Sequence, residues 1–384
     1  MDLEDYWGVG PKTSERLESE LGTGAAIEAI ESGDVRTLVG AGLSRGRATR
    51  ILRRAGGEEG MDVLATRDAR TVYKELLDLA SDHAVTAGAE DRIRVLTPLR
   101  AREAMEERLD AVTDAVDSWA GLDSETRETI LDAFAEYDDT DGGDRAAVDV
   151  ALRLRAVGAS GDVFAPLAAL DPDALDDAAG ALSALDDGDV RDGADDRLDR
   201  LRASVAEVER LEGSAFDVLD SIREQGAGGA GGGRGSAGSR GVDELREAVV
   251  GYLDRETAVS VDEIRRAAPE EAADAADFVG ETLRELGENL RERAAERERE
   301  VREDLEESVG EARADVDAAV EAVEDIALYL SLARFALAYD LTRPRFREEK
   351  ALAVENARNL GLAAGGEEIQ PIDYAIGDHD LDLP

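Results

Sequence analysis

The chain has 384 residues, and its 90 Asp and Glu against 45 Lys and Arg give a formal net charge of −45. This length allows about two or three domains with a buried core, and the 43% of apolar residues distinguishes the chain from disordered acidic tails. The absence of Cys excludes disulfides, thiolate zinc sites and a Cys nucleophile, and two His cannot build a multi-His metal site.

The basic residues are almost all arginine, since only Lys12, Lys74 and Lys350 are lysines. An acidic surface low in Lys keeps a protein soluble at very high salt, so we interpret the composition as halophilic and archaeal-type. The N-terminal segment MDLEDYWGVG is acidic and has no apolar signal-peptide region. The apolar segment 326–339 is too short for a membrane span and contains Arg334. We therefore expect a cytoplasmic protein.

A short glycine motif occurs twice near the N-terminus. Gly8–Leu17 has the pattern Gly-apolar-Gly followed by a small residue and an apolar residue, and Gly42–Ile51 repeats it with Ser44 at the second Gly. Gly permits positive φ, so consecutive N–H groups can converge on a phosphate, while the next helix directs its positive N-terminal end at the same anion. Small Ser14 and Ala48 would allow the helices to approach closely.

This pair of motifs resembles a tandem helix-hairpin-helix module, here at 1–57, which binds DNA phosphates without reading bases. From Val35 to Ala55 there are six Arg and no acidic residue, which favours an anionic partner. A helical hairpin that packs on a neighbouring domain, or that binds protein, is the alternative. At high salt, binding would depend on backbone hydrogen bonds and topological clamping. The predicted DNA-binding residues are Gly8, Gly10, Lys12, Thr13, Gly42, Ser44, Arg45, Arg47 and Arg50.

The rest of the chain predicts a mainly α fold. Amphipathic helices are expected at 72–79 and 102–119, and apolar residues spaced by threes and fours from Leu283 to Ile326 predict one helix of about 70 residues, roughly 100 Å long. A partner helix at 198–222 would complete an antiparallel lever arm. The tract 226–241 has nine Gly in sixteen residues and predicts a flexible linker, followed by a small clamp at 242–268. A glycine phosphate loop is the alternative, but no Lys-Ser/Thr pair follows the tract.

Several segments resemble the MutS family, in the branch that lacks the mismatch-recognition N-terminal domain. They are Tyr73–Ala80, Ala89–Leu99 and Glu103–Asp110, which resemble the opening of the core domain, and Ala327–Pro344, which resembles the return from lever to core. The resemblance implies a helical core at 61–195 completed by 327–346, a lever arm at 196–326, and an incomplete ATPase domain beginning with short strands at 347–384. It implies structure-directed, sequence-independent binding of branched or mismatched DNA in mismatch repair or recombination control, by a homodimer that encloses the DNA.

The phosphate loop of the family's ATPase domain is missing from this sequence. That loop needs Gly-Lys-Ser/Thr, and the three lysines follow Pro11, Tyr73 and Glu349. We therefore predict no enzyme activity, no catalytic residues and no cofactor in this chain; ATP and magnesium would come only with a separate or downstream ATPase domain. No metal site is predicted, since Asp378-His379-Asp380 is interpreted as a solvated turn. The alternatives are a coiled-coil scaffold whose N-terminal module binds protein, and the DNA-binding half of a split ATPase.

Overall fold

The computed structural model describes residues 2–55, 63–140, 143–186, 188–214, 217–222, 240–348, 351–366 and 368–377. Most of the predicted glycine linker (226–239), Lys350 and the trio 378–380 lie outside the described residues. The chain forms two compact units. Unit 1 contains Met1–Ala179 and Ala312–Pro384, and unit 2 contains Gly180–Glu311.

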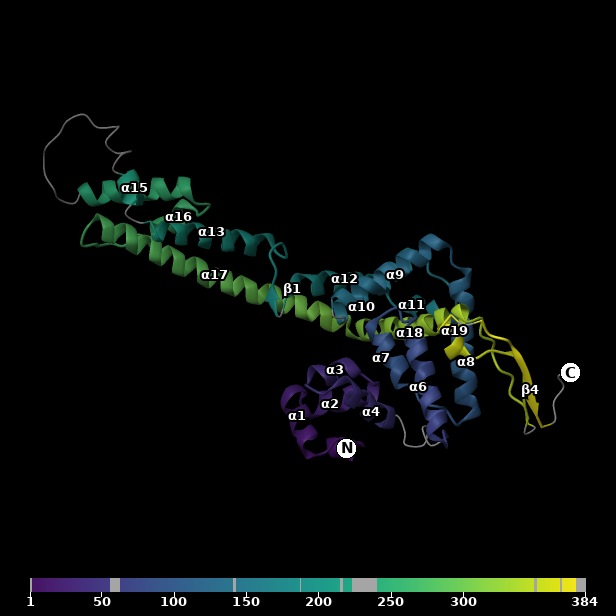
Figure 1. Ribbon diagram of the computed structural model, residues 1–384. Helices are drawn as coiled ribbons and strands as arrows, with labels where there is room; N and C mark the ends of the chain where they lie inside the picture. The colour runs from purple at the N-terminus through teal and green to yellow at the C-terminus, as the bar shows by residue number, and fades with distance from the viewer. Residues whose placement is uncertain are drawn as a thin grey trace. The chain divides into compact units, whose positions relative to one another are not determined.

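The N-terminal part of unit 1 is a small helical domain with its own core (purple in Figure 1). Its elements are η1 (Leu3–Asp5), α1 (Pro11–Leu21), α2 (Thr23–Ser32), α3 (Val35–Gly40) and α4 (Arg45–Ala55). Gly22 and Gly33, both with positive φ, separate α1 from α2 and end α2. Asp34 begins α3 by accepting a hydrogen bond from the amide of Thr37. These local signals divide a 55-residue segment into short helices that can pack around one centre.

The body of unit 1 is built around one long buried helix, α18 (Arg313–Ala338). Ile326, Leu330 and Ala333 on this helix are buried, because α7, α8 and α10 all pack against it. The predicted helices at 72–79 and 102–119 are confirmed, since they lie within α6 and α8. The other body elements are α6 (Arg67–Ser81), α7 (Ala87–Val95), α8 (Arg102–Gly121), α9 (Ser124–Asp139), α10 (Asp144–Ala156), η2 (Asp162–Phe164), α11 (Ala165–Ala168) and α12 (Pro172–Ala184).

Unit 2 contains a pair of antiparallel helices, α13 (Asp196–Glu212) and α17 (Ala275–Glu311). The single helix expected at 198–222 ends at Glu212, before Gly213. Two ion pairs join the helices, Asp195–Arg297 at 2.7 Å and Glu209–Arg291 at 2.9 Å. Residue numbers rise along α13 as they fall along α17, so the two helices are antiparallel. The region predicted as a clamp forms α15 (Arg240–Glu256) and α16 (Val261–Ala267), which share one apolar core with α13 and α17. A two-residue antiparallel pair, β1 (Leu185–Asp186) and β2 (Asp189–Val190), precedes α13.

The prediction of a single helix of about 70 residues is wrong, because the helix is interrupted at Ala312. α17 ends at Glu311 and α18 begins at Arg313. Gly310 weakens the helix just before this point, and the carbonyl of Ala312 accepts from the amides of Asp315 and Val316 as the first turn of a new helix. The division between units falls at the same place, so 312–326 belongs to unit 1, whereas the sequence assigned it to the lever. Residues 180–195 belong to unit 2 and not to the core.

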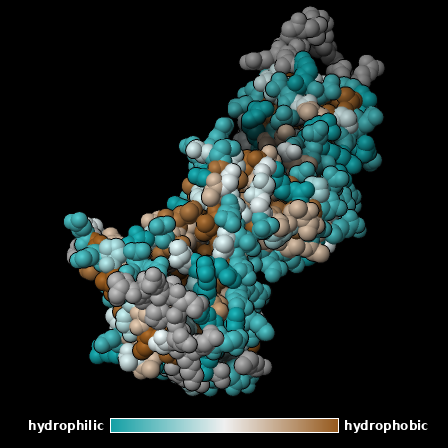
Figure 2. All heavy atoms as spheres, turned by 90° about the vertical axis from the view of Figure 1, so that its right-hand side faces the viewer, coloured by the Kyte–Doolittle hydropathy of each residue, from teal (hydrophilic) through white to brown (hydrophobic). Residues whose placement is uncertain are grey.

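The C-terminal segment forms a two-stranded antiparallel ribbon, as its short strand patterns predict. β3 (Leu352–Ala357) pairs with β4 (Ile372–Ile376), and α19 (Leu360–Ala364) lies between them in sequence. Leu352 stands opposite Ile376 and Val354 opposite Tyr374, so four large side chains share one face. All four are exposed, and Figure 2 views the molecule from this side, where apolar (brown) groups reach the surface.

Among the residues that the structure describes, no helix is both long and apolar enough to cross a membrane.

Candidate nucleic-acid interface

The two predicted glycine bends have the backbone conformation that glycine favours. Gly8 has φ +87° and Gly42 has φ +84°. A Cβ atom on Gly8 would be strained by this backbone conformation and would crowd Cγ1 of Ile51, 3.3 Å away. Gly10 differs, because its φ is −99° and a Cβ would meet nothing within 4 Å. Its carbonyl accepts from the amides that begin α1, so Gly10 acts as a helix start and not as a bend.

Side chains from each motif connect the two bends. Arg16 of the first motif donates to the carbonyl of Gly42, 2.9 Å away. Arg47 of the second motif donates to Oγ1 of Thr13 at 2.5 Å, and lies 3.5 Å from the carbonyl oxygen of Gly8. The two bends therefore lie side by side. Ser14 and Ala48, which were expected to let the helices approach closely, are buried, and so are the apolar residues Leu17 and Ile51.

At the second bend, the hairpin amides expected to hold an anion are already bonded, which leaves only the helix start that the sequence also indicated. The amide of Gly42 donates to the carbonyl of Val39 at 2.9 Å, and that of Leu43 to the carbonyl of Leu38 at 3.2 Å. The amides of Arg45 and Gly46 begin α4 and have no acceptor within the helix or elsewhere in the described chain. The glycine of the second bend therefore sets the turn, and the start of α4 presents the free donors.

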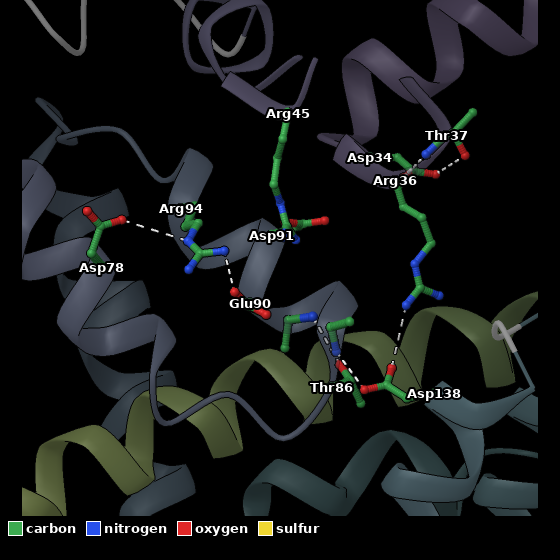
Figure 3. A network of polar contacts seen from close by, with 12 residues as sticks. Asp34, Arg36, Thr37, Arg45, Asp78, Thr86, Glu90, Asp91, Arg94 and Asp138 are labelled. Carbon is green, nitrogen blue, oxygen red and sulfur yellow. Dashed lines mark hydrogen bonds and ion pairs between the residues drawn. The ribbon is translucent and has the colours of Figure 1, made fainter. Parts of the chain in front are cut away.

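Three of the six arginines counted in the sequence bind the protein's own body, and we call Arg36, Arg45 and Arg53 the inner arginines. Figure 3 shows Arg36 and Arg45 with their carboxylate partners. Nη2 of Arg45 lies 2.5 Å from Oδ1 of Asp91 on α7, whose side chain is only 8% exposed, and this hydrogen bond raises the pKa of Arg45. Arg36 lies 3.9 Å from Asp138 on α9. Arg45 was predicted to bind phosphate, but here its guanidinium is held by a carboxylate.

The third inner arginine, Arg53, donates from Nε to the carbonyl of Arg94 at 2.6 Å. Burial lowers the pKa of Arg53, and burial raises the pKa of Asp138, the partner of Arg36. These groups are therefore partly removed from water where the N-terminal helices meet α7 and α9. Packing of the hairpin on a neighbouring domain, the alternative given above, therefore explains three of the six arginines in this segment.

Four other basic residues are exposed, and with Trp7 they form what we call the outer set: Trp7, Lys12, Arg47, Arg50 and Arg54. Arg47, Arg50 and Arg54 are spaced by three and four residues, which places them along one side of α4. Lys12 and Arg50 are exposed and have no hydrogen-bond or ion-pair partner in the described part of the chain. Arg54 lies over the ring of Trp7, 3.7 Å from its centroid.

Sequence reasoning missed Trp7, Arg54 and Arg16. The position of Trp7 directly before the Gly8 bend, and of Arg54 one turn after Arg50, could have indicated the first two. No sequence signal pointed to the contact of Arg16 with Gly42, because it depends on how the two motifs pack.

Among the described residues, no group of three His, Cys, Asp or Glu side chains could hold a metal ion. Comparisons with protein-family models, with curated proteins and with solved structures found no match for this chain.

Proposed function

We propose that this protein binds DNA through its phosphate backbone, without reading base sequence, and that the outer set makes the contact. The observation that carries the proposal is the pair of glycine bends joined by Arg16 and Arg47, beside which Lys12 and Arg50 pair with no group of the described residues. In a chain where acidic residues outnumber basic ones by 90 to 45, an exposed arginine without a carboxylate partner needs a reason. An external polyanion supplies one.

The dimensions of the outer set fit a nucleic-acid strand. Arg47 to Arg54 spans seven residues, about 10 Å along the helix at 1.5 Å per residue. This length corresponds to about three nucleotides at 3.4 Å per nucleotide of duplex. The free amides at the start of α4 add hydrogen bonds directed at the same strand, and these lose less strength than ion pairs as salt rises.

We extend the proposal to a role of the MutS type, the binding of branched or mismatched DNA in repair or recombination control. It is supported by the sequence resemblance, by the antiparallel α13–α17 pair and by α15 and α16, which lie between these helices in sequence. In this role the protein acts as a homodimer, or with a partner subunit that carries the ATPase site.

A protein-binding scaffold is the second candidate function. The apolar face of the β3–β4 ribbon favours it, because Leu352 and Ile376 remain 55% and 59% exposed. This candidate predicts that the chain captures a protein and binds no DNA.

The test is the affinity for a labelled four-way junction, measured by fluorescence anisotropy over a range of KCl concentrations. The variant Lys12→Glu/Arg50→Glu should bind about 100-fold more weakly, since two attractive phosphate contacts become repulsive. Its thermal unfolding should be unchanged, because neither side chain has a partner in the described part of the chain.

The matched control is Arg67→Glu/Lys74→Glu, which makes the same charge change on exposed positions of α6 in the same unit. Its affinity should stay within about twofold of the parent protein, because these positions lie outside the proposed interface. Equal losses in the two variants would show that net charge alone governs binding and would reject the proposed interface. Absence of binding by the parent protein would reject the function.

A further inference from the structure

The outer set contains one aromatic residue, Trp7, which directly precedes the first glycine bend at Gly8. We propose that Trp7, held by Arg54, is a stacking platform for an unpaired DNA base. The protein would then bind most tightly where a duplex opens into a flap, a mismatch or a single strand. This inference rests on the proposed DNA binding and names the kind of DNA that the same surface selects.

The exposure of Trp7 sets it apart from its neighbours. Tyr6 and Val9 are only 7% and 5% exposed within the N-terminal core, whereas Trp7 between them in sequence is 41% exposed. The other tryptophan, Trp119, is 8% exposed. The chain has only 4% aromatic residues, so an exposed indole next to the predicted phosphate contacts is a distinctive feature of this surface.

The two Trp–Arg pairs differ in whether the N–H groups of the arginine are already used within the protein. Arg127 lies 5.7 Å from the ring centroid of Trp119, and its guanidinium donates to the backbone carbonyls of Trp119 and Ala120. Arg54 lies closer to its ring, at 3.7 Å, and donates to no acceptor in the described chain. Its N–H groups therefore remain available to a phosphate while its Cζ atom lies over the ring of Trp7.

An unpaired base is the ligand that such a platform can take. Bases within a duplex are already stacked on both faces, whereas a base in a single strand or at an opening offers a free face to an aromatic side chain. Arg50 lies one helical turn from Arg54, so a phosphate contact stands next to the platform. Stacking is tolerant of sequence, and it depends less on salt than phosphate contacts do.

The first measurement follows the fluorescence of Trp7 itself. In the variant Trp119→Phe, Trp7 is the sole tryptophan. Addition of a single-stranded oligonucleotide or a flapped duplex should quench its emission, because the base stacks on the indole. A covalently closed circular duplex should bind without comparable quenching.

The second measurement compares affinities in the full chain with its natural Trp119. Trp7→Leu should weaken binding of the flapped duplex by about 5- to 150-fold and leave binding of the closed circular duplex unchanged. Trp7→Phe keeps an aromatic face and should retain most of the preference for the flapped duplex. It is the control for a loss of binding that is caused by misfolding. Two results would overturn the stacking platform but not the proposed DNA binding. One is that Trp7 is not quenched although the circular duplex still binds; the other is that Trp7→Leu weakens the binding of both DNAs equally. Failure of the parent protein to bind any of these DNAs would overturn the proposed function with it.

Discussion

Two sets of arginines in one short stretch of chain have opposite environments. The inner arginines, including Arg45 and Arg53, contact α7 and α9, whereas Arg47, Arg50 and Arg54 are exposed and pair with no carboxylate of the described residues. On α4 the sets alternate with the helical period, so neighbours in sequence lie on different sides. A cluster of arginines in a sequence can therefore contain both residues that pair within the protein and residues that are exposed to a ligand. Only the partner of each guanidinium in the folded chain distinguishes the two kinds.

The partners explain the difference in physical terms. Asp91 is a nearly buried carboxylate, and a buried charge needs a counter-charge, which Arg45 supplies. Arg50 pairs with no carboxylate in the part of the chain that the structure describes, so no internal contact there accounts for its charge. The comparison can therefore be tested by charge reversal at one position of each set.

The largest expected effect on stability comes from Arg45→Glu, which would set a second carboxylate against Asp91. Loss of a partner from a fully buried pair costs about 3–5 kcal/mol, and an exposed pair contributes less than about 1 kcal/mol. Because the Arg45 side chain is 53% exposed, we expect a loss of about 2 kcal/mol in the free energy of unfolding, measured by denaturant titration.

Arg50→Glu is the matched control on the same helix and should change the unfolding free energy by less than about 0.5 kcal/mol. Equal destabilisation by the two reversals would remove the distinction between inner and outer arginines.

The glycine bends provide a second and somewhat smaller test. Gly8→Ala places a Cβ at φ +87° and 3.3 Å from Ile51, which should lower the unfolding free energy by about 1–2 kcal/mol. Gly10→Ala, two residues away at φ −99° in open space, should cost only a few tenths of a kcal/mol. Denaturant titration of both variants checks this, and similar losses would show that the bend does not depend on the conformation of Gly8.

A test of another kind, the dependence of stability on pH, concerns Tyr6, the buried neighbour of exposed Trp7. Its hydroxyl donates to Oε1 of Glu31 at 2.7 Å, and this hydrogen bond raises the pKa of Tyr6 from 10.0 to about 12. The protonated phenol therefore adds stability that is fully present below pH 10 and is lost as pH rises through about 12. Thermal unfolding across this range should show the loss, and Tyr6→Phe should remove it. An unchanged alkaline profile in Tyr6→Phe would contradict the assignment.

The sequence predicted the features that depend on local pattern. Apolar spacing indicated the helices, and the Gly-apolar-Gly motif located the bend at Gly8. It did not reveal the break at Ala312, because the spacing of threes and fours continues through it from Leu283 to Ile326. Nor could it separate Gly8 from Gly10, since only the folded backbone shows which one has positive φ.

The candidate site was less predictable than the fold. The partner of Arg45 is 46 residues away in sequence, and Arg92 and Asp325 pair over a still longer separation. Such contacts depend on tertiary packing, and in a chain with 90 acidic residues no sequence rule selects the right carboxylate. The count of six arginines therefore described the local charge correctly. It could not reveal that three of these arginines have partners within the protein.

The most direct test of the central claim is the salt dependence of DNA binding, plotted as log affinity against log KCl concentration. Arg50→Ala should reduce the magnitude of the slope by about 0.9, the value for one lost contact to a duplex phosphate, whereas Arg45→Ala should leave the slope unchanged. A slope that falls with Arg45→Ala and not with Arg50→Ala would contradict the assignment of the outer set to DNA.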